Sequence, residues 1–444
     1  MMTHPQNKPD GVAAHFSSVA RLQAMLHVEA ALADAEASVG VIPRAAAEAI
    51  RRAARAELYD PLAIESEARH AGNLAIPLVR HLAARVGSTD VASARYVHWG
   101  ATSQDIIDTA LVLQLRESVP MIIGDLARAA DAAAGHARRH AQTPMVGRTW
   151  LQQATPITFG LKAAGWLDAL DRVTGSLRSA LDGALVLQLG GASGTLAALG
   201  DQGPAVATAM GHALTLTVAA IPWHAHRDRL ATLACALGVA TGTAGKIARD
   251  LGLLAQTEVA EAHEPAGAAG SSSSMPHKQN PVRAAIAIAA AVRAPGLVAT
   301  MLSAMPQEHE RGLGGWQAEW DTLPELVTIA GDGAGAVAAA LETLVVDPAR
   351  MRTNLDSTGG LVLAEAVALR LAPTMGKPEA HAHIERAARR AAGEHRRFAD
   401  VLAEDPDIAA ILDRSSIEQA LSPDNYLGSA ATFVAHVLAR HEKA

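Results

Sequence analysis

Cysteine and aromatic residues are scarce in this 444-residue chain. The single cysteine, Cys235, excludes an intrachain disulfide and a cysteine-based metal site, which is typical of proteins from reducing compartments. Aromatic residues account for 3% of the chain, while alanine and leucine dominate it. Since β-sheets are enriched in aromatic and β-branched residues, and alanine and leucine are strong helix formers, this composition predicts a helical protein.

Positive charge is also scarce, because 38 Lys and Arg residues stand against 45 Asp and Glu residues. This balance argues against broad attraction to nucleic acid or to an anionic membrane surface. The first residues, MMTHPQNKPDGVAAH, lack the basic start and apolar run of a signal peptide. The most apolar stretch, residues 284–302, is interrupted by Arg293 and Pro295 and predicts a buried bundle helix. We therefore expect a cytoplasmic protein with no nucleic-acid or membrane partner.

Long helices are indicated by apolar residues that recur at alternating intervals of three and four. One such seam runs from Leu230 to Leu254, and with no proline before Glu264 it predicts a single helix of about 35 residues, on the order of 50 Å long. A second seam runs from Leu170 to Leu187. Further helices are predicted from Pro120 to about Thr143, from the Thr155-Pro156 pair onward, and from Pro281 to about residue 304.

These segments predict an all-α fold of three helical regions with a central long-helix bundle. The expected regions are an N-terminal helical domain at 1–114, the bundle at 115–350 and a C-terminal helical domain at 351–444. Small residues within the seams allow close helix packing. This packing is compatible with an oligomer and with a monomeric bundle. Continued in register, the seam ending at Leu254 meets Glu258 and Glu261, which we expect to be polar anchors at the buried end of that helix.

The stretch GSSSSMPHKQNP, residues 270–281, is too poor in apolar residues to be core, so it is either a linker or a site. A linker uses Gly and Ser without needing the Met-Pro-x-Lys-x-Asn-Pro sequence that follows here. Its serines can donate hydrogen bonds, Lys278 supplies a positive charge, and Pro281 predicts a helix N-terminus, where anions are favoured. These features predict a loop that binds carboxylates.

Metal and nucleotide sites find no support in the other polar segments. The segment EVAEAHEP at 258–265 lacks the His-Glu-x-x-His pattern, and WHAHRDR at 223–229 offers His224 and His226 without a third ligand. For these two histidines a hydrogen-bonded or solvated ring is favoured. The segment LGGASGTLAALG at 189–200 lacks the Gly-Lys-Ser/Thr ending of a phosphate loop and is expected to be a turn of the bundle. We expect no metal and no cofactor.

The SSSMPHKQNP part of the loop is similar to the signature loop of the fumarase and aspartase superfamily, Gly-Ser-Ser-x-Met-Pro-x-Lys-x-Asn. Two more blocks resemble that superfamily in the expected order, HWGATSQDIIDTA from His98 and GRTWLQQATPITFG from Gly147. The resemblance covers the whole chain. It implies a homotetramer in which each site is assembled from three subunits.

Trp150 stands where the superfamily's Arg-Thr-His block has a histidine thought to assist catalysis. This departure, the Gly-rich segment and the QEHERGLGGWQAEWDTLPEL segment from Gln307 resemble bacterial cycloisomerases of the superfamily, which close an acyclic tricarboxylate into a lactone. The reverse reaction expels a carboxylate, whose conjugate acid has a pKa of about 4, so no histidine acid is required. The alternatives are an adenylosuccinate lyase-like C–N lyase and a non-catalytic structural member of the fold.

The resemblance also implies roles for residues of the three blocks. Ser272, three residues before Met275, is expected to exchange the proton next to a carboxylate, and Lys278 to stabilise the charge that develops. The residues expected to bind a small tricarboxylate substrate are His98, Thr102, Ser103, Trp150, Gln152, Ser273, Asn280 and Arg311. Ser271 stands where the superfamily has Gly, and Gln279 where Arg is common, so the choice of Ser272 over its two neighbours stays open.

Overall fold

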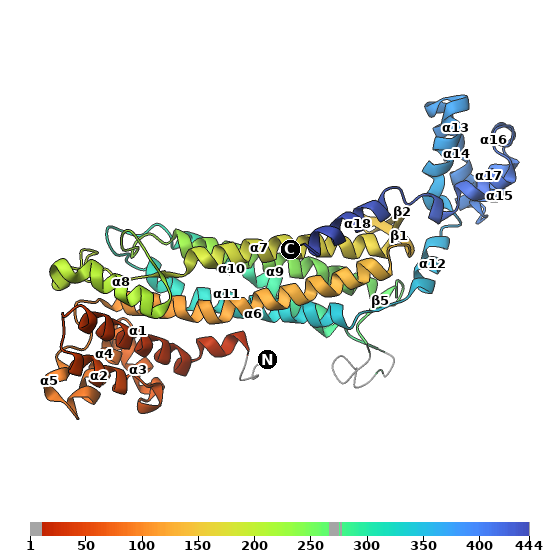
Figure 1. Ribbon diagram of the computed structural model, residues 1–444. Coiled ribbons are helices and arrows are strands. Elements are labelled where there is room, and N and C mark those ends of the chain that lie inside the picture. Colours follow the sequence, from red (N-terminus) through yellow and green to blue (C-terminus); the bar gives the residue numbers. More distant parts are fainter. Residues whose placement is uncertain (1–10, 266–274, 276–277, 444) are drawn as a thin grey trace. The chain divides into compact units, whose positions relative to one another are not determined.

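The computed structural model describes residues 11–265, 275 and 278–443. Figure 1 shows that helices make up the fold, with strands confined to short pairs. In the described ranges these pairs are β1 (Pro144–Thr149) with β2 (Gln152–Thr158), β3 (Val186–Leu187) with β4 (Thr217–Val218), and β5 (Ala262–His263) with β6 (Val345–Val346). The first and third pairs are antiparallel and the second is parallel. The predicted all-α class is confirmed.

The helices follow one another along the chain in three groups. The first group is α1 (Ser18–Ser38), α2 (Arg44–Ala53), α3 (Pro61–Ala71), α4 (Ala75–Gly87) and α5 (Val91–Ala94). The second is α6 (Ser103–Arg139), α7 (Phe159–Ala184), α8 (Gly203–Leu214), α9 (Asp228–Leu254), α10 (Val282–Ser303) and α11 (Gly315–Glu342). The third is α12 (Pro348–Asp356), α13 (Ala364–Met375), α14 (Lys377–Gly393), α15 (Phe398–Glu404), α16 (Pro406–Ala409), α17 (Arg414–Ala420) and α18 (Ala430–His441). Short 3-10 helices span Val12–Phe16, Ala56–Leu58, Ala197–Gln202, Leu361–Leu363 and Pro423–Asn425.

The seam predicted from Leu230 to Leu254 is buried along α9. Its members are each at most 4% exposed: Leu230, Leu233, Leu237, Ala240, Ala244, Ile247, Leu251 and Leu254. In α7 the members of the seam from Leu170 to Ala184 are each at most 9% exposed, and Leu187 follows in β3. Burying an aliphatic side chain stabilises a fold by about 1.5–3 kcal/mol relative to leaving it exposed, so the apolar seams account for the long helices.

Helix α9 ends at Leu254 and does not reach the predicted end at Glu264. The chain turns through Ala260, whose φ is +49°, and the buried Glu261 then pairs with Arg148 through N–O distances of 2.7 and 2.8 Å. A buried carboxylate needs such partners, and the apolar seam of a helix offers none. The predicted continuation of the helix in register to Glu258 and Glu261 is therefore wrong. A polar anchor at the helix end is confirmed for Glu261, whose backbone N–H donates to the Leu254 carbonyl at 3.0 Å, whereas Glu258 is exposed.

The predicted helix start at Pro120 is wrong, because Pro120 lies inside α6. The helix already begins at Ser103, and Val119 and Ile122 on either side of the proline are buried. A proline inside a helix removes one backbone hydrogen bond and costs about 3 kcal/mol or more, so packing of this kind has to offset the cost.

The Thr155-Pro156 pair lies in β2 and does not begin a helix, so that prediction is also wrong. Pro156 pairs across the antiparallel ladder with Val146, and α7 begins only at Phe159, after the strand. Pairing with β1 thus decides the conformation of this segment, against its local sequence signal. The predicted start at Pro281 is confirmed, since α10 begins at Val282 and ends at Ser303.

Contacts divide the chain into two compact units. Unit 1 comprises the chain up to Asp125, Val173–Ala244 and Ala289–Gly335. Unit 2 comprises Leu126–Arg172, Gly245–Ile288 and the chain from Ala336 onward. The division into three domains at 1–114, 115–350 and 351–444 stays a prediction.

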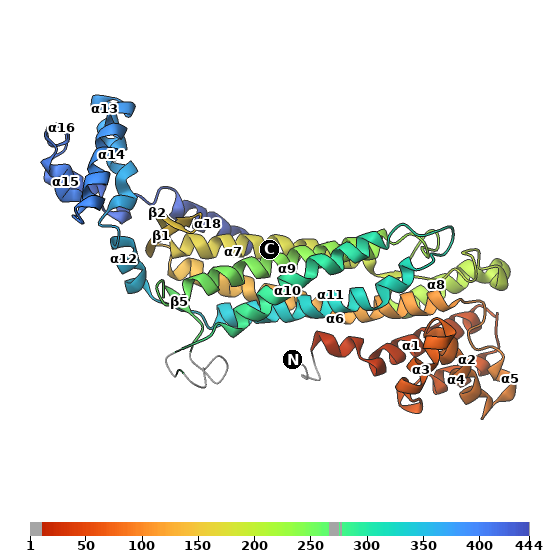
Figure 2. The same ribbon diagram turned by 180° about the vertical axis from the view of Figure 1, so that it is seen from behind.

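The C-terminal helices of unit 2 have a core of their own. In Figures 1 and 2, helices α13 to α17 cluster together. Their buried apolar side chains include Val367, Leu371, Ile384, Phe398, Leu402, Ile408 and Ile417. The last helix, α18, contacts α6 and α7 through His441, whose ring nitrogens lie 3.0 Å from an oxygen of Asp171 and 3.1 Å from one of Asp131.

Candidate active site

Arg311, in the segment between α10 and α11, is held against the Gly-rich segment in unit 1. Its guanidinium donates to Thr102 Oγ1 at 2.8 Å, to the Ala192 carbonyl at 2.8 Å and to the Gly191 carbonyl at 3.2 Å. Ser103 follows as the first residue of α6. The structure therefore brings three predicted substrate-binding residues together, and the partners it gives Arg311 in the described chain are neutral oxygens.

A buried carboxylate, Asp105, organises this part of unit 1. It accepts hydrogen bonds from the backbone N–H groups of Thr102, Gly190 and Gly191 at 2.9 to 3.0 Å. His224 Nε2 lies 2.7 Å from Asp105 Oδ1, the oxygen that also accepts from Gly190, which confirms the predicted hydrogen-bonded histidine. Gly191 has a φ of +68°, a left-handed conformation that glycine adopts without strain. Asp105 lies within the first block, yet its role was not predicted, because its partners are distant in sequence.

A second buried cluster surrounds Arg227, which is no more than 2% exposed. Its guanidinium contacts the Asp108 carboxylate at 2.7 and 3.1 Å and the Glu319 carboxylate at 2.6 Å. Burial raises the pKa of Glu319, although the nearby Arg227 acts in the opposite direction. Trp316 Nε1 also donates to Asp108, at 2.9 Å. This cluster joins α6 and α11 and was not predicted from the sequence, which shows no pattern that pairs these positions.

His98 lies just before the residues that hold Arg311. Its Nδ1 is 2.7 Å from Glu29 Oε1, and the Glu29 side chain is fully buried. Burial alone would lower the pKa of His98, but the Glu29 and Asp105 carboxylates outweigh it and raise that pKa above its ordinary value. The two carboxylates thus favour the charged form of His98 beside the Thr102 segment.

Trp150 and Gln152 lie at the β1–β2 turn in unit 2. Trp150 is 98% exposed and has a φ of +53°, and Leu151 beside it has a φ of +62°. Gln152 begins β2 and pairs with Thr149 across the turn. Two successive residues with positive φ form a tight hairpin connection, which presents the indole to solvent.

Of the signature loop, the structure describes Met275 and the residues from Lys278. Ser272 and Ser273 lie outside the described residues. Lys278 and Asn280 are exposed, and the Lys278 backbone N–H donates to the Met275 carbonyl at 3.0 Å. Helix α10 begins directly after Pro281, so Lys278 and Asn280 precede a helix N-terminus, as predicted.

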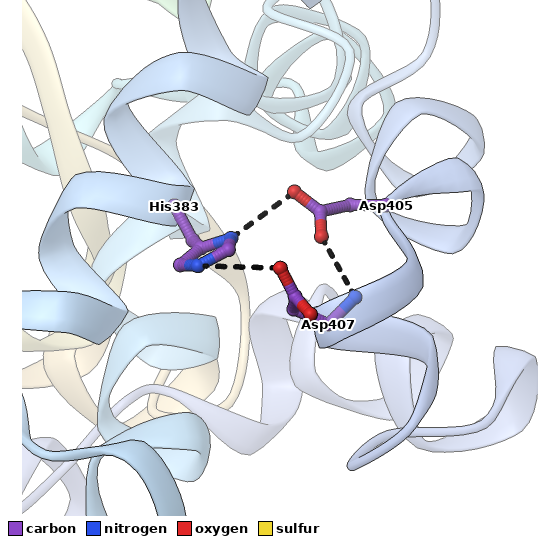
Figure 3. Close-up of side chains that lie close together, drawn as sticks. All are labelled: His383, Asp405 and Asp407. Atoms are coloured by element: carbon purple, nitrogen blue, oxygen red, sulfur yellow. Dashed lines mark hydrogen bonds and ion pairs between the residues drawn. The ribbon is translucent and has the colours of Figure 1, made fainter.

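One cluster of potential metal ligands occurs in the part of the chain that the structure describes: His383, Asp405 and Asp407 (Figure 3). His383 Nδ1 lies 3.2 Å from Asp405 and Nε2 lies 3.8 Å from Asp407. The second oxygen of Asp405 accepts from the backbone N–H groups of Asp407 and Ile408 at the start of α16. These contacts join α14 to α15 and α16, so we interpret the cluster as a packing contact of the C-terminal helices.

Two family models match the chain. The model described as lyase matches residues 5–296, which include the blocks from His98 and Gly147 and the signature loop. The model described as adenylosuccinate lyase C-terminus matches residues 360–437. Together they account for most of the sequence.

Close relatives extend over nearly the full chain. The 3-carboxy-cis,cis-muconate cycloisomerase of Pseudomonas aeruginosa is 52% identical over 429 residues, covering 96% of this chain and 94% of that protein. The protein of the same name from Bradyrhizobium diazoefficiens is 49% identical and covers 94% and 93% of the two chains. Among solved structures, the 3-carboxy-cis,cis-muconate lactonizing enzyme of Pseudomonas putida matches with a TM-score of 0.92 at 47% identity, covering 97% of each chain. This chain therefore belongs to the lyase family, within the fumarase and aspartase superfamily that its three sequence blocks resemble.

Proposed function

We propose that this protein is a cycloisomerase that interconverts 3-carboxy-cis,cis-muconate and 4-carboxymuconolactone in the catabolism of protocatechuate. The names and near full-length similarity of its relatives carry this proposal. Trp150 supports it, because this position lacks the histidine that the superfamily pattern has there. A C–N lyase must protonate a poor leaving group, whereas lactone opening expels a carboxylate that leaves unprotonated at neutral pH.

The reaction needs one proton exchange and no cofactor. In the lactonising direction a substrate carboxylate oxygen adds to a double-bond carbon, and the electron pair of that bond moves to the carbon next to another carboxylate. Ser272 then donates a proton to this carbon, and in the reverse direction its alkoxide removes the proton. Lys278 and the loop amides stabilise the alkoxide and the enolate-like intermediate electrostatically.

Binding a trianion requires cations whose charge is not already neutralised. Arg311 meets this requirement, since its partners in the described chain are a hydroxyl and two carbonyl oxygens. Lys278 is exposed at the start of α10, and His98 carries a raised pKa. The overall charge of the protein is −7, so such cations attract the substrate only when they are grouped locally.

A homotetramer with sites shared between subunits follows from the superfamily resemblance. Two observations support association. Trp150 is almost fully exposed on the single chain, although it is expected to line a pocket. Helices α9 and α10 are long and apolar enough to cross a membrane, and only 22% of the apolar window of α10 is buried, against 56% for α9. We assign the uncovered face of α10 to contact with other copies of a cytoplasmic protein.

An ultraviolet assay tests the proposed function. The purified protein is offered 3-carboxy-cis,cis-muconate, and adenylosuccinate and argininosuccinate in parallel. We expect the absorbance of the conjugated muconate to fall as the lactone forms, with no turnover of the other two compounds. Turnover of adenylosuccinate alone would favour a C–N lyase, and inertness toward all three compounds would favour a non-catalytic member of the fold.

A further inference from the structure

Helix α1 carries two buried glutamates behind His98. Glu29 and Glu36 are seven residues apart, which places them on the same face of the helix, and both are at most 1% exposed. Glu29 Oε1 contacts His98 Nδ1, whereas neither carboxyl oxygen of Glu36 has a hydrogen-bond partner in the part of the chain described. A buried carboxylate is costly unless it is paired, so the contact with His98 gives Glu29 a role that Glu36 lacks.

The backbone at His98 is held in a conformation that is uncommon for residues other than glycine. Its φ is +59°, in the left-handed region, which costs a residue other than glycine of the order of 1 kcal/mol or more. The side chain is 18% exposed, and the structure gives Nε2 no protein partner among the described residues. The strained backbone and the buried carboxylate together direct the ring so that Nδ1 faces the protein and Nε2 remains available.

The charged state of the ring decides what Nε2 can bind. With Glu29 accepting from Nδ1–H, a neutral His98 would present a lone pair at Nε2, which repels an anion. A protonated His98 presents an N–H donor instead. The acidic groups near His98 are Glu29 and, beyond it, Glu36 on α1, together with Asp105 on α6, which is itself paired with His224.

We propose that Glu29 is a positioning residue for the cycloisomerase reaction. Its carboxylate orients the His98 ring and keeps it protonated, so that Nε2–H binds a carboxylate of the substrate. This inference rests on the proposed function for its ligand, a tricarboxylate. Glu29 itself contacts no substrate and acts only through His98.

Glu29→Gln tests the proposal, with Glu36→Gln as its matched control. The glutamine at position 29 can still accept from Nδ1–H but carries no charge, so the His98 pKa falls. Since the anion is bound by the protonated ring, binding is lost as pH rises through that pKa, and the loss begins at lower pH in Glu29→Gln. We expect KM to rise about tenfold near neutral pH, with kcat changed far less. Burial and the nearby Glu29 raise the pKa of Glu36 to about 9, so Glu36→Gln replaces a neutral acid and should leave the KM profile unchanged.

A direct titration separates this inference from the proposed function. The ring nitrogens of His98 are followed by NMR in the ¹⁵N-histidine-labelled wild-type protein, with the His98→Asn spectrum used to assign the signal. We expect Nδ1 to stay protonated and the ring to titrate above the ordinary value of about 6.5. A wild-type ring that titrates at or below that value, or equal KM shifts in Glu29→Gln and Glu36→Gln, would overturn the proposal. If the protein turns over no muconate, the proposed function fails, and the titration still decides whether Glu29 controls His98.

Discussion

Arg311 owes its position to a side chain that it does not contact. The carboxylate of Asp105 fixes the backbone of Thr102 and of the Gly190–Gly191 turn, and these segments in turn supply the oxygens that hold the guanidinium. Because those oxygens are neutral, Arg311 keeps its full positive charge. The buried acid thus places the cation without neutralising it.

Ser272→Ala should lower kcat by several orders of magnitude while KM changes little, because the proton transfer proposed for Ser272 contributes to the transition state and not to substrate binding. Steady-state kinetics with 3-carboxy-cis,cis-muconate measure both constants. Ser274→Ala, two residues away in the same loop, is the control and should lower kcat only slightly. Equal and small effects at Ser271, Ser272 and Ser273 would show that the loop binds substrate without catalysing, and would make His98 the first candidate for the proton donor.

Residues proposed to bind the substrate were easier to predict than the buried residues that support them. The three blocks were found because the chemistry of a loop or a turn requires a short local pattern, as in the signature loop around Lys278. Glu29 left a weaker signal, since it and Glu36 recur seven residues apart on an otherwise apolar helix face. The sequence gives no signal for the role of Arg227, because its partners Asp108 and Glu319 lie about a hundred residues away on either side. Only folding brings the three residues together.

At the scale of elements, apolar periodicity predicted helices α7 and α9 but not where α9 ends. The α9 seam was predicted correctly from its spacing, because a buried helix face requires that period. The end of α9 at Leu254 depends on the ion pair between Glu261 and Arg148. The formation of strand β2 depends on its pairing with β1. Both are contacts between segments that no local pattern connects.

Arg227→Met should destabilise unit 1 by about 3–5 kcal/mol, because it leaves the buried Asp108 and Glu319 carboxylates without their cation. Urea unfolding at neutral pH measures the change. The control is Arg293→Met, which removes an ion pair with Glu325 in which both side chains are more than 40% exposed, and which should cost less than about 1 kcal/mol. Equal effects of the two substitutions would mean that the buried cluster contributes no more than a surface ion pair.

At the scale of the whole molecule, the apolar surface of α10 points to assembly. Val292 in the middle of this helix is 66% exposed on the single chain. An exposed apolar helix face of this kind usually marks a protein interface.

We expect light scattering to report a tetramer for the wild-type protein. The Val292→Glu substitution should lower the measured mass and abolish activity, because a charge would be buried at the contact between subunits. Leu62→Glu is the control, since Leu62 on α3 is 70% exposed and should tolerate the charge without a change of mass. A fully active monomer would contradict the shared site.

The exposed indole of Trp150 also gives the protein an optical probe. The sequence has six tryptophans, of which Trp166, Trp223 and Trp316 are at most 4% exposed and Trp150 is 98% exposed. A further tryptophan, Trp99, is 41% exposed. Indole emission shifts to shorter wavelengths when water is excluded, so the red edge of the spectrum reports on the β1–β2 turn and, to a smaller extent, on Trp99. Fluorescence can therefore follow the covering of this turn by a neighbouring subunit or by substrate in the unmodified protein, without any attached dye.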